Sequence, residues 1–268
     1  MTTRNVRALR SRIAGNEKLR DGFHLLRLEA PHLAEASTPG QFVLLRGLTP
    51  AWPYLKRPFS IYSSDGDSMV EIVYKVVGCA TGLMSKMADE ELEVLGPLGK
   101  GFEPRPGRTA VIGVAGGAGL PPVAFYCQRC VDVLDSITLV VGAKTVQELL
   151  LPVGMVARGV DLKPYTEDGS KGKRGTAVDG LTEALGQAAD TSGVQVVACG
   201  PREMLARVAR VSAERGAVCD VSLEEMMGCG LGACMACAVP RVGGGYLHAC
   251  QDGPVVDATE IDWGRWPA

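Results

Sequence analysis

Four cysteines near the C-terminus have the residue type and the spacing to bind a metal cluster. They are Cys229, Cys234, Cys237 and Cys250, and they follow the pattern C-x4-C-x2-C, a gap of twelve residues, and a last C. This is the plant-type spacing of [2Fe–2S] ligands. Glycines at positions 228, 230 and 232 let the loop wrap closely, because glycine tolerates positive φ. The pattern therefore predicts a [2Fe–2S] cluster, which carries electrons singly.

Two other interpretations compete for the same four cysteines. Two disulfides would also use them, but no other feature of the sequence indicates secretion. Four thiolates can also close a tetrahedral zinc site. Zinc ribbons usually pair two C-x2-C knuckles, whereas this segment has one C-x2-C preceded by the x4 spacing. The spacing favours iron–sulfur, and a zinc-stabilised nucleotide-binding protein without redox activity is the alternative.

The length and composition of the chain indicate a globular protein. Its 268 residues, 46% of them hydrophobic and 22% charged, have room for two domains and a small third part. The net charge is −2, and Lys and Arg are spread along the chain, which argues against nucleic-acid binding. The sequence has neither an apolar h-region near its start nor a bilayer-length apolar run. We therefore expect a cytoplasmic protein with no membrane contact and with its other cysteines reduced.

The order of the expected elements divides the chain into three parts. Residues 1–104 read as short strands between Gly, Pro and Asp turns, with one helix at 81–90, which predicts an antiparallel barrel. Over residues 105–218 strands and helices alternate, with a helical piece expected at 145–159, which predicts a parallel sheet covered by helices. Residues 219–268 are too few for a core of their own, so the cluster should hold them together.

Two loops of the second part could bind a nucleotide. The stretch GVAGGAGLPP (113–122) follows an apolar strand and opens a helix, an arrangement that can hold a pyrophosphate. The stretch ACGP (198–201) ends a later strand, and the carboxyl ends of parallel strands share one edge of the sheet. Glycine also occurs in tight turns that bind nothing, so the first loop alone is weak evidence for a nucleotide site. Cys127 and Cys130 fall in the helix after it, where we expect them to pack.

Two stretches of the barrel also suit a phosphate-bearing ligand. RPFSIYS (57–63) places an arginine, which can pair with a phosphate, beside a proline in a strand, followed by hydroxyl and aromatic groups. YKVVGCATG (74–82) ends a strand with a glycine-containing turn before a helix. An ordinary strand is an equally good interpretation of RPFSIYS viewed alone.

The order of these stretches resembles the ferredoxin–NADP reductase superfamily. The matching stretches are RPFSIYS, the VVGxxT turn, GPLGKGF, GGAGLPP and CGP. The segment EEMMGCGLGACMACAV narrows the resemblance to the electron-transfer subunits of NAD-dependent (class B) dihydroorotate dehydrogenases. Over nearly the whole chain, the resemblance implies an N-terminal antiparallel Greek-key flavin-binding barrel (1–104), a parallel-sheet α/β NAD-binding domain (105–218) and a small C-terminal [2Fe–2S] domain (219–268).

The resemblance also implies which residues contact the cofactors. The implied FAD contacts are Arg57, Pro58, Phe59, Ser60, Tyr74, Lys75, Val76, Ala80, Thr81 and Gly82. The implied nicotinamide-nucleotide contacts are Gly117, Gly119, Cys199, Gly200 and Pro201, and the implied cluster ligands are the four cysteines. Ala80 departs from the family's G-x-G-T diphosphate loop, in which glycine is usual at its position, and this puts the backbone contact there in doubt.

The implied activity is electron transfer between NAD(H), FAD, the [2Fe–2S] cluster and the FMN of a separate catalytic subunit. That subunit oxidises dihydroorotate to orotate in pyrimidine biosynthesis, and the two are expected to form a heterotetramer. This chain should need no catalytic residue for dihydroorotate. Lys144, after the second strand of the sheet, favours NADP, whereas the resemblance implies NAD. A subunit of a hydrogenase, a sulfite reductase or a ferredoxin-dependent bifurcating enzyme is the alternative function.

Overall fold

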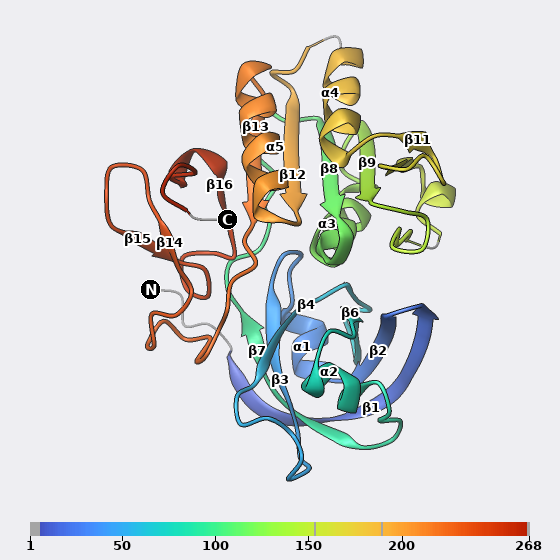
Figure 1. Cartoon of the computed structure of the whole chain (residues 1–268), viewed down its shortest axis with the longest axis vertical. Helices are drawn as coiled ribbons and strands as arrows, with labels where there is room; N and C mark the ends of the chain where they lie inside the picture. Colours follow the sequence, from blue (N-terminus) through green and yellow to red (C-terminus); the bar gives the residue numbers. More distant parts are fainter. Residues whose placement is uncertain (1–5, 153, 189, 267–268) are drawn as a thin grey trace.

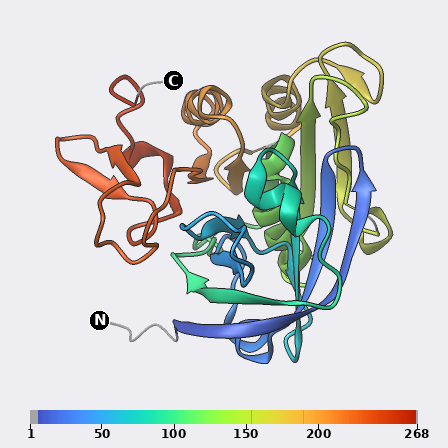
Figure 2. The same ribbon diagram turned by 60° about the horizontal axis from the view of Figure 1, so that its bottom comes forward.

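The computed structural model describes residues 6–152, 154–188 and 190–266. It consists of a curled antiparallel sheet, a mainly parallel sheet flanked by helices, and a smaller C-terminal part beside both (Figure 1). The turned view in Figure 2 again places the C-terminal part to one side of the two sheets. No helix among the described residues is long and apolar enough to cross a membrane.

The first sheet is a barrel that is open along one seam. Its strands are β1 (Arg7–Arg20), β2 (Phe23–Glu29), β3 (Phe42–Gly47), β4 (Arg57–Ser60), β5 (Ser63–Ser64), β6 (Met69–Lys75) and β7 (Glu91–Leu98). They pair antiparallel in the order β4-β3-β7-β1-β2-β6-β5. Only Ile61 and Tyr62 separate β4 from β5, which are the two edges, so the sheet must curl to bring its edges together. The predicted barrel is confirmed.

Two short helices accompany the barrel. Helix α1 (Pro31–Ala36) was not expected from the sequence. Helix α2 (Cys79–Met84) begins before and ends well before the expected range 81–90. It ends early because the Asn16 side chain, from β1, donates hydrogen bonds to the carbonyls of Met84 and Met87. A tertiary contact that the local sequence does not encode therefore sets this boundary.

The second sheet has the order β11-β10-β9-β8-β12-β13-β16. Its strands are β8 (Ala110–Gly116), β9 (Ser136–Ala143), β10 (Asp161–Thr166), β11 (Lys173–Arg174), β12 (Val194–Cys199), β13 (Val218–Ser222) and β16 (Val255–Asp257). All pairings are parallel except that of β16 with β13. The short turn η1 (Gly117–Gly119) links β8 to α3.

Helices cover both faces of this sheet, as predicted for a parallel sheet. Helix α3 (Leu120–Cys130) packs on one face, and α4 (Ala177–Gln187) and α5 (Arg202–Glu214) pack on the other. Alternate residues of β8 point to the two sides: Val111 and Ala115 pack with α3, and Ile112 and Val114 with α4 and α5. Both cysteines of α3 are buried, which confirms that they pack in the core.

The helix expected at 145–159 is wrong. The described part of this segment contains only a 3-10 turn, η2 (Val156–Arg158), and residue 153 lies outside the described residues. Pro152 lacks the N–H that a helix interior needs, and Gly154 has a φ of 79°. Leu149 and Leu150 are buried as part of an irregular loop. The apolar residues that suggested a helix therefore serve packing.

The C-terminal part shares its core with the rest of the molecule. It contains β14 (Ala238–Pro240), β15 (Tyr246–His248) and η3 (Ala258–Glu260), while β13 and β16 join the parallel sheet. Buried residues of the barrel and of this part belong to one cluster: Leu44, Leu98, Cys237, Leu247 and Cys250. Protein packing therefore supports this part in addition to any metal.

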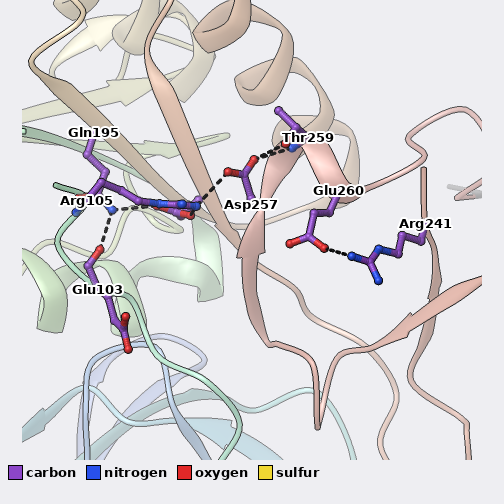
Figure 3. Close-up of polar contacts among 8 residues, drawn as sticks. Glu103, Arg105, Gln195, Arg241, Asp257, Thr259 and Glu260 are labelled. Carbon is purple, nitrogen blue, oxygen red and sulfur yellow. Dashed lines mark hydrogen bonds and ion pairs between the residues drawn. The ribbon is translucent and has the colours of Figure 1, made fainter. Parts of the chain in front are cut away.

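A network of charges around Arg105 joins the second and third parts (Figure 3). The guanidinium donates to Asp220 of β13 (Nε to Oδ2, 3.0 Å) and to Asp257 of β16 (2.9 Å). Gln195 of β12 donates to the same Asp220 carboxylate (2.8 Å) and accepts from the Arg105 backbone N–H (3.2 Å). Hydrogen bonding to Asp220 raises the pKa of Arg105, with burial opposing it. Arg105 follows the barrel directly, so the network ties together three distant chain segments.

Candidate functional site

A cavity of about 480 Å³ lies where the three parts meet. Its wall comes from β4, from β6 and the turn before α2, from Ala118 and Pro121 beyond β8, and from the segment that follows β13. Its volume falls in the range of roughly 300–1,000 Å³ that is typical of ligand and cofactor pockets. The structure therefore provides one cleft shared by the two sheets.

Eight of the ten predicted flavin contacts line this cavity. They are Arg57, Pro58, Phe59, Ser60, Tyr74, Lys75, Ala80 and Thr81. The other two, Val76 and Gly82, are outside the lining and support the turn through backbone hydrogen bonds to Gly22 (2.7 Å) and Gly78 (2.8 Å). Predicted contact residues from segments that are distant in sequence thus line one cavity.

The RPFS stretch forms the edge strand β4. Pro58 has no N–H to donate, and an edge strand tolerates it because one side of such a strand is unpaired. The Arg57 guanidinium donates to the Leu55 carbonyl at 2.6 Å, which orients the side chain at the cavity wall. A guanidinium has five N–H donors, so others remain for a phosphate.

Tyr74 forms a fixed aromatic wall of the cavity. Its hydroxyl donates to Asn16 (3.0 Å), and its ring meets the edge of the Phe59 ring at 6.0 Å between centroids. Burial raises the pKa of Tyr74 to about 12, so the phenol stays neutral at physiological pH. The flat neutral surface suits a planar ring system.

The turn before α2 is closed by the Thr81 hydroxyl. Thr81 Oγ1 accepts hydrogen bonds from the N–H groups of Val77 (3.0 Å) and Gly78 (3.2 Å). Ala80 is 6% exposed and its methyl group packs in the barrel core. The departure from glycine at Ala80 is therefore accommodated by packing, and the turn still borders the cavity.

The two predicted nucleotide loops lie against each other. Strands β8 and β12 are parallel neighbours, with Ala115 paired to Cys199, so their following loops leave from the same edge. A Cβ added at Gly119 would stand 2.3 Å from the Cys199 carbonyl oxygen. Gly117 has a φ of 54° and Gly200 a φ of 156°, which favour glycine. The first loop borders the cavity through Ala118 and Pro121. The five predicted nucleotide contacts, Gly117, Gly119, Cys199, Gly200 and Pro201, lie outside the cavity lining.

The sequence analysis missed the segment that closes the third side. Ser222, Leu223, Glu224, Glu225 and Met227 line the cavity, although they lie far from the barrel in sequence. The available signal was the acidic pair directly before the cysteine motif. The buried Cys199 thiol contacts Oε1 of the solvent-exposed Glu224 at 3.8 Å, and burial raises the pKa of Cys199.

The cysteine loop presents backbone N–H groups to its sulfurs. Cys229 Sγ accepts from Leu231 (3.4 Å), Ala233 (3.3 Å) and Cys234 (3.4 Å). The Gly232 N–H points at Cys250 Sγ (3.2 Å), so the distant fourth cysteine lies beside the loop. Such donors stabilise thiolates and help to set the potential of an iron–sulfur cluster.

The four sulfurs form two pairs. Cys237 and Cys250 have their sulfurs 3.3 Å apart, and the side chains of Cys229 and Cys234 interact with each other. Among the described residues no three metal-binding side chains surround a single point. Two thiolate pairs suit two irons, whereas a zinc site needs one tetrahedral set. The residues present fit a [2Fe–2S] cluster.

The two pairs differ in their electrostatics. At Cys229 burial acts against ionisation, but the backbone N–H groups prevail and lower the pKa of its thiol to about 6. At Cys250 burial, together with the neighbouring Cys237 sulfur, raises the pKa to about 12. The backbone N–H groups around Cys229 thus stabilise its thiolate without a metal, whereas Cys250 needs the positive charge of a metal to ionise near neutral pH.

The cavity and the cysteine loop are contiguous. Met227 lines the cavity, and Cys229 is two residues further along the chain. Their Cα atoms are therefore separated by at most about 7 Å. On the other side, Gly230 packs closely on the barrel, because an added Cβ would stand 2.7 Å from Leu44. An electron carrier in the loop would sit beside a cofactor in the cavity.

The fold and the site define the class of protein. A flavin-type barrel, a nucleotide-binding sheet and a cysteine loop around one cavity are the parts of an NAD(P)H-linked flavin and iron–sulfur oxidoreductase. The sequence model of the iron–sulfur cluster binding domain of dihydroorotate dehydrogenase B matches residues 224–262. The chain belongs to the electron-transfer subunits of NAD-dependent dihydroorotate dehydrogenase B, as its curated relatives show.

Three relatives illustrate this membership. The electron-transfer subunit from Desulforamulus reducens is 32% identical over 90% of this chain and 92% of its own length. The subunit from Geobacillus sp. is 35% identical over 88% and 91%. The subunit from Caldanaerobacter subterraneus is 31% identical over 94% and 98%. The predicted family, and with it the prediction of FAD, a [2Fe–2S] cluster and NAD(H) as cofactors, is confirmed at the level of the family.

Solved structures agree with the fold. A chain of the NADH-dependent reduced ferredoxin–NADP oxidoreductase, described for flavin-based electron bifurcation, superimposes with a TM-score of 0.82 and 26% identity, covering 96% of this chain and 91% of that one. A ferredoxin–NADP⁺ reductase from Neisseria gonorrhoeae, with bound FAD and NADP, has a TM-score of 0.67 at 16% identity, covering 78% and 92%. The barrel and nucleotide-binding arrangement is thus that of the ferredoxin reductases.

Proposed function

We propose that this chain passes electrons between NAD(H) and a separate, FMN-containing dihydroorotate dehydrogenase subunit, which converts dihydroorotate to orotate. The observation that carries the proposal is the contiguity of three sites. The first nucleotide loop reaches the cavity at Ala118, and the segment that leads to the cysteine loop reaches it at Met227. An electron at any one of these sites therefore has the next site beside it. Membership of the family supports the choice of partner.

We assign the cavity to FAD. Arg57 and the turn at Ala80 and Thr81 would bind its phosphates, and Ser60, Tyr74 and Lys75 would border its ring. When bound, the flavin exchanges a hydride with NAD(H) and single electrons with the cluster. The residues of this chain orient the two ligands and exclude water between them.

We assign the nicotinamide nucleotide to the loops at Gly117, Gly119, Cys199, Gly200 and Pro201. The two loops leave the same edge of the sheet and pack on each other at Gly119 and Cys199, and the start of a helix after such a loop favours a pyrophosphate. The buried Cys199 thiol is positioned by Glu224 at the cavity. We assign the cluster to Cys229, Cys234, Cys237 and Cys250. We also propose that the chain is divided into the three expected domains, residues 1–104, 105–218 and 219–268.

The surface around the cysteine loop supports a docking partner there. Met226, Leu231 and Met235 are 84%, 56% and 57% exposed, and Cys234 is exposed among them. Exposed apolar side chains gathered beside a redox centre are typical of a protein contact. We propose that the catalytic subunit binds here, in a cytoplasmic heterotetramer with no membrane or nucleic acid partner.

The proposal is tested by reconstitution. The chain, loaded with FAD and cluster, is mixed with the catalytic subunit of the same organism, and dihydroorotate-dependent NAD⁺ reduction is followed by absorbance. We expect turnover only when both subunits are present. A stable complex without NAD⁺ reduction would refute the function.

A second candidate is a subunit of a bifurcating NADH-dependent complex. The likeness to the bifurcating oxidoreductase chain extends over 96% of this chain, including the C-terminal part. Its 26% identity is lower than the 31–35% of the curated relatives quoted above, so it ranks second. Purification of the native complex and identification of the bound subunit distinguishes the two candidates.

A further inference from the structure

We propose that Asn16 is a positioning residue, which holds the aromatic wall of the cavity, Tyr74, in a fixed relation to the turn before α2. The inference rests on the proposed function, because it concerns the FAD that we assign to this cavity. Asn16 belongs to β1 and lies outside the cavity lining. It therefore acts through the two walls that it contacts and not through FAD itself.

A bulge in β1 turns the Asn16 side chain into the barrel. Ile13 pairs with Leu28 of the neighbouring strand β2, and Asn16, three residues further along β1, pairs with Leu26, only two residues back along β2. Opposite residues of paired strands share one face of a sheet, and both leucines are fully buried. Ile13 and Asn16 are therefore both directed inward, which strict alternation along β1 would not allow. Bulges often re-aim a side chain in this way next to active sites.

The carboxamide of Asn16 joins two elements of the cavity wall. Its Nδ2 donates to the carbonyls of Met84 (2.6 Å) and Met87 (2.9 Å). Its Oδ1 accepts from the Tyr74 hydroxyl (3.0 Å). An asparagine amide has two N–H donors, and only these can face two carbonyls, so the contacts fix which end of the amide is the oxygen. The side chain thus bridges α2 and β6.

On the first side, Asn16 holds the end of α2. The last carbonyls of a helix lack acceptor partners within the helix itself, and Met84 and Met87 belong to the barrel core, where an unpaired carbonyl is costly. The same helix follows the turn that Thr81 closes and that lines the cavity. Because α2 has only six residues, a fixed end also fixes the turn at its start.

On the second side, Asn16 fixes the ring of Tyr74. This ring stacks with that of His24 (5.4 Å between centroids) and meets the edge of Phe59 (6.0 Å). Aromatic contacts tolerate a range of offsets, so they restrain the tilt of the ring more than its sliding. The hydrogen bond from the hydroxyl to Asn16 removes that remaining freedom.

The two walls need a fixed separation because they would contact different parts of one molecule. In FAD a flexible chain links the ring to the phosphates, and ordering such a chain costs affinity unless the site is preorganised. Asn16 sets the relation of the two walls before FAD binds. Loss of its carboxamide should weaken the hold on FAD and let the ring shift within the cavity.

The test compares four variants of the full chain loaded with FAD and cluster. They are Asn16→Leu, Tyr74→Phe, the double variant of these two, and Ser64→Ala. Leucine has the branched shape of asparagine and no polar group, so Asn16→Leu removes all three hydrogen bonds, whereas Tyr74→Phe removes one. The rise of flavin fluorescence after dilution measures the release of FAD. Visible circular dichroism reports the surroundings of the bound ring.

We expect Asn16→Leu to release FAD about tenfold faster, the size of effect that one lost buried hydrogen bond produces. Its visible circular dichroism should also change, because the ring is no longer held in one place. Tyr74→Phe should accelerate the release less and change the dichroism in the same direction. The double variant should match Asn16→Leu, because the hydroxyl has no further effect once its partner is gone.

Ser64→Ala is the matched control. The Ser64 hydroxyl donates to the carbonyl of Ala34 (2.7 Å), so this variant also removes a partly buried hydrogen bond between a barrel strand and the last turn of a short helix. Both residues lie outside the cavity lining. We expect Ser64→Ala to lower the melting temperature and to keep the FAD release and the dichroism of the unsubstituted chain.

Several outcomes would overturn the inference. They are unchanged release and dichroism in Asn16→Leu, additive effects in the double variant, and an equal acceleration of release by Ser64→Ala. If Asn16→Leu does not fold, Tyr74→Phe decides, since unchanged release and dichroism there would show that the bond to Asn16 does not position the ring. Failure of dihydroorotate-dependent NAD⁺ reduction in the unsubstituted complex with FAD bound would count against the proposed function and leave these measurements intact.

Discussion

Gly119 and Cys199 are in direct backbone contact: a Cβ on Gly119 would stand 2.3 Å from the carbonyl oxygen of Cys199 and 2.6 Å from the nitrogen of Gly200. The contact joins the loops that follow β8 and β12, which are parallel neighbours. It explains why glycine is needed at 119 through a close approach of two loops, independent of any ligand.

Gly119→Ala should therefore damage the nucleotide site. The backbone is fixed by two strands and cannot yield cheaply, so the loops must separate. We expect the affinity for ADP-ribose to fall about tenfold or more, equivalent to about 1.4 kcal/mol, with FAD content retained. Isothermal titration measures it. Gly186→Ala in α4, where no atom lies within 4 Å of the added Cβ, is the control and should leave the affinity unchanged. Equal affinities in all three proteins would contradict the assignment of the loops.

We expect different stability losses from two arginines that Figure 3 shows at opposite sides of the close-up, Arg105 and Arg241. Arg105→Ala leaves the buried Asp220, 5% exposed, without its cation. We expect a loss of about 3 kcal/mol in the free energy of unfolding, the low end for a broken buried pair, because Arg105 itself is partly exposed. Arg241→Ala breaks an exposed pair with Glu260 and should cost about 0–1 kcal/mol. Urea denaturation of both variants measures the two losses. Equal losses in the free energy of unfolding would show that Arg105 contributes no more to stability than the exposed Arg241.

Cys234→Ser and Cys237→Ser should both lose the cluster, with different consequences for folding. Cys234 is exposed, so its loss should leave FAD and NADH-to-dye activity largely intact. Cys237 is 2% exposed in a core shared with the barrel, and a buried serine hydroxyl without a partner costs about 1–3 kcal/mol. Iron content, flavin absorbance and thermal melting report the three effects. An unstable Cys234→Ser that also loses FAD would mean that the cluster is needed to fold the rest.

The cysteine loop predicts selective alkylation in cluster-free protein. The pKa of Cys229 is lowered to about 6, so above that pH its thiolate is the reactive form. The pKa of Cys250 is raised to about 12 and its thiol is buried, so it should stay unmodified at pH 7. Iodoacetamide labelling followed by mass spectrometry should show Cys229 modified with a midpoint near pH 6. Equal labelling of the two cysteines at pH 7 would contradict the role of the backbone N–H groups.

Local patterns predicted the elements whose side chains alternate or whose turns have a fixed chemistry. RPFS is an edge strand because Pro58 cannot lie in a central one, and the Gly117–Gly119 turn begins with Gly117, whose φ of 54° favours glycine. The prediction of a helix at 145–159 is wrong because it relied on the spacing of apolar residues and did not take Pro152 and Gly154 into account. The end of α2 depends on Asn16, which no local pattern could indicate.

The sequence by itself determined four cysteines at cluster spacing, a glycine-containing turn before a helix, and the alternation that makes one sheet antiparallel and the other parallel. These are properties of spacing along the chain. Only the tertiary structure decided that Met227 lines the cavity two residues before Cys229, and that Glu224 meets Cys199 within it. The physical reason is that β13 adds to the parallel sheet beside β12, so its carboxyl end delivers the following segment to the same edge as the nucleotide loops.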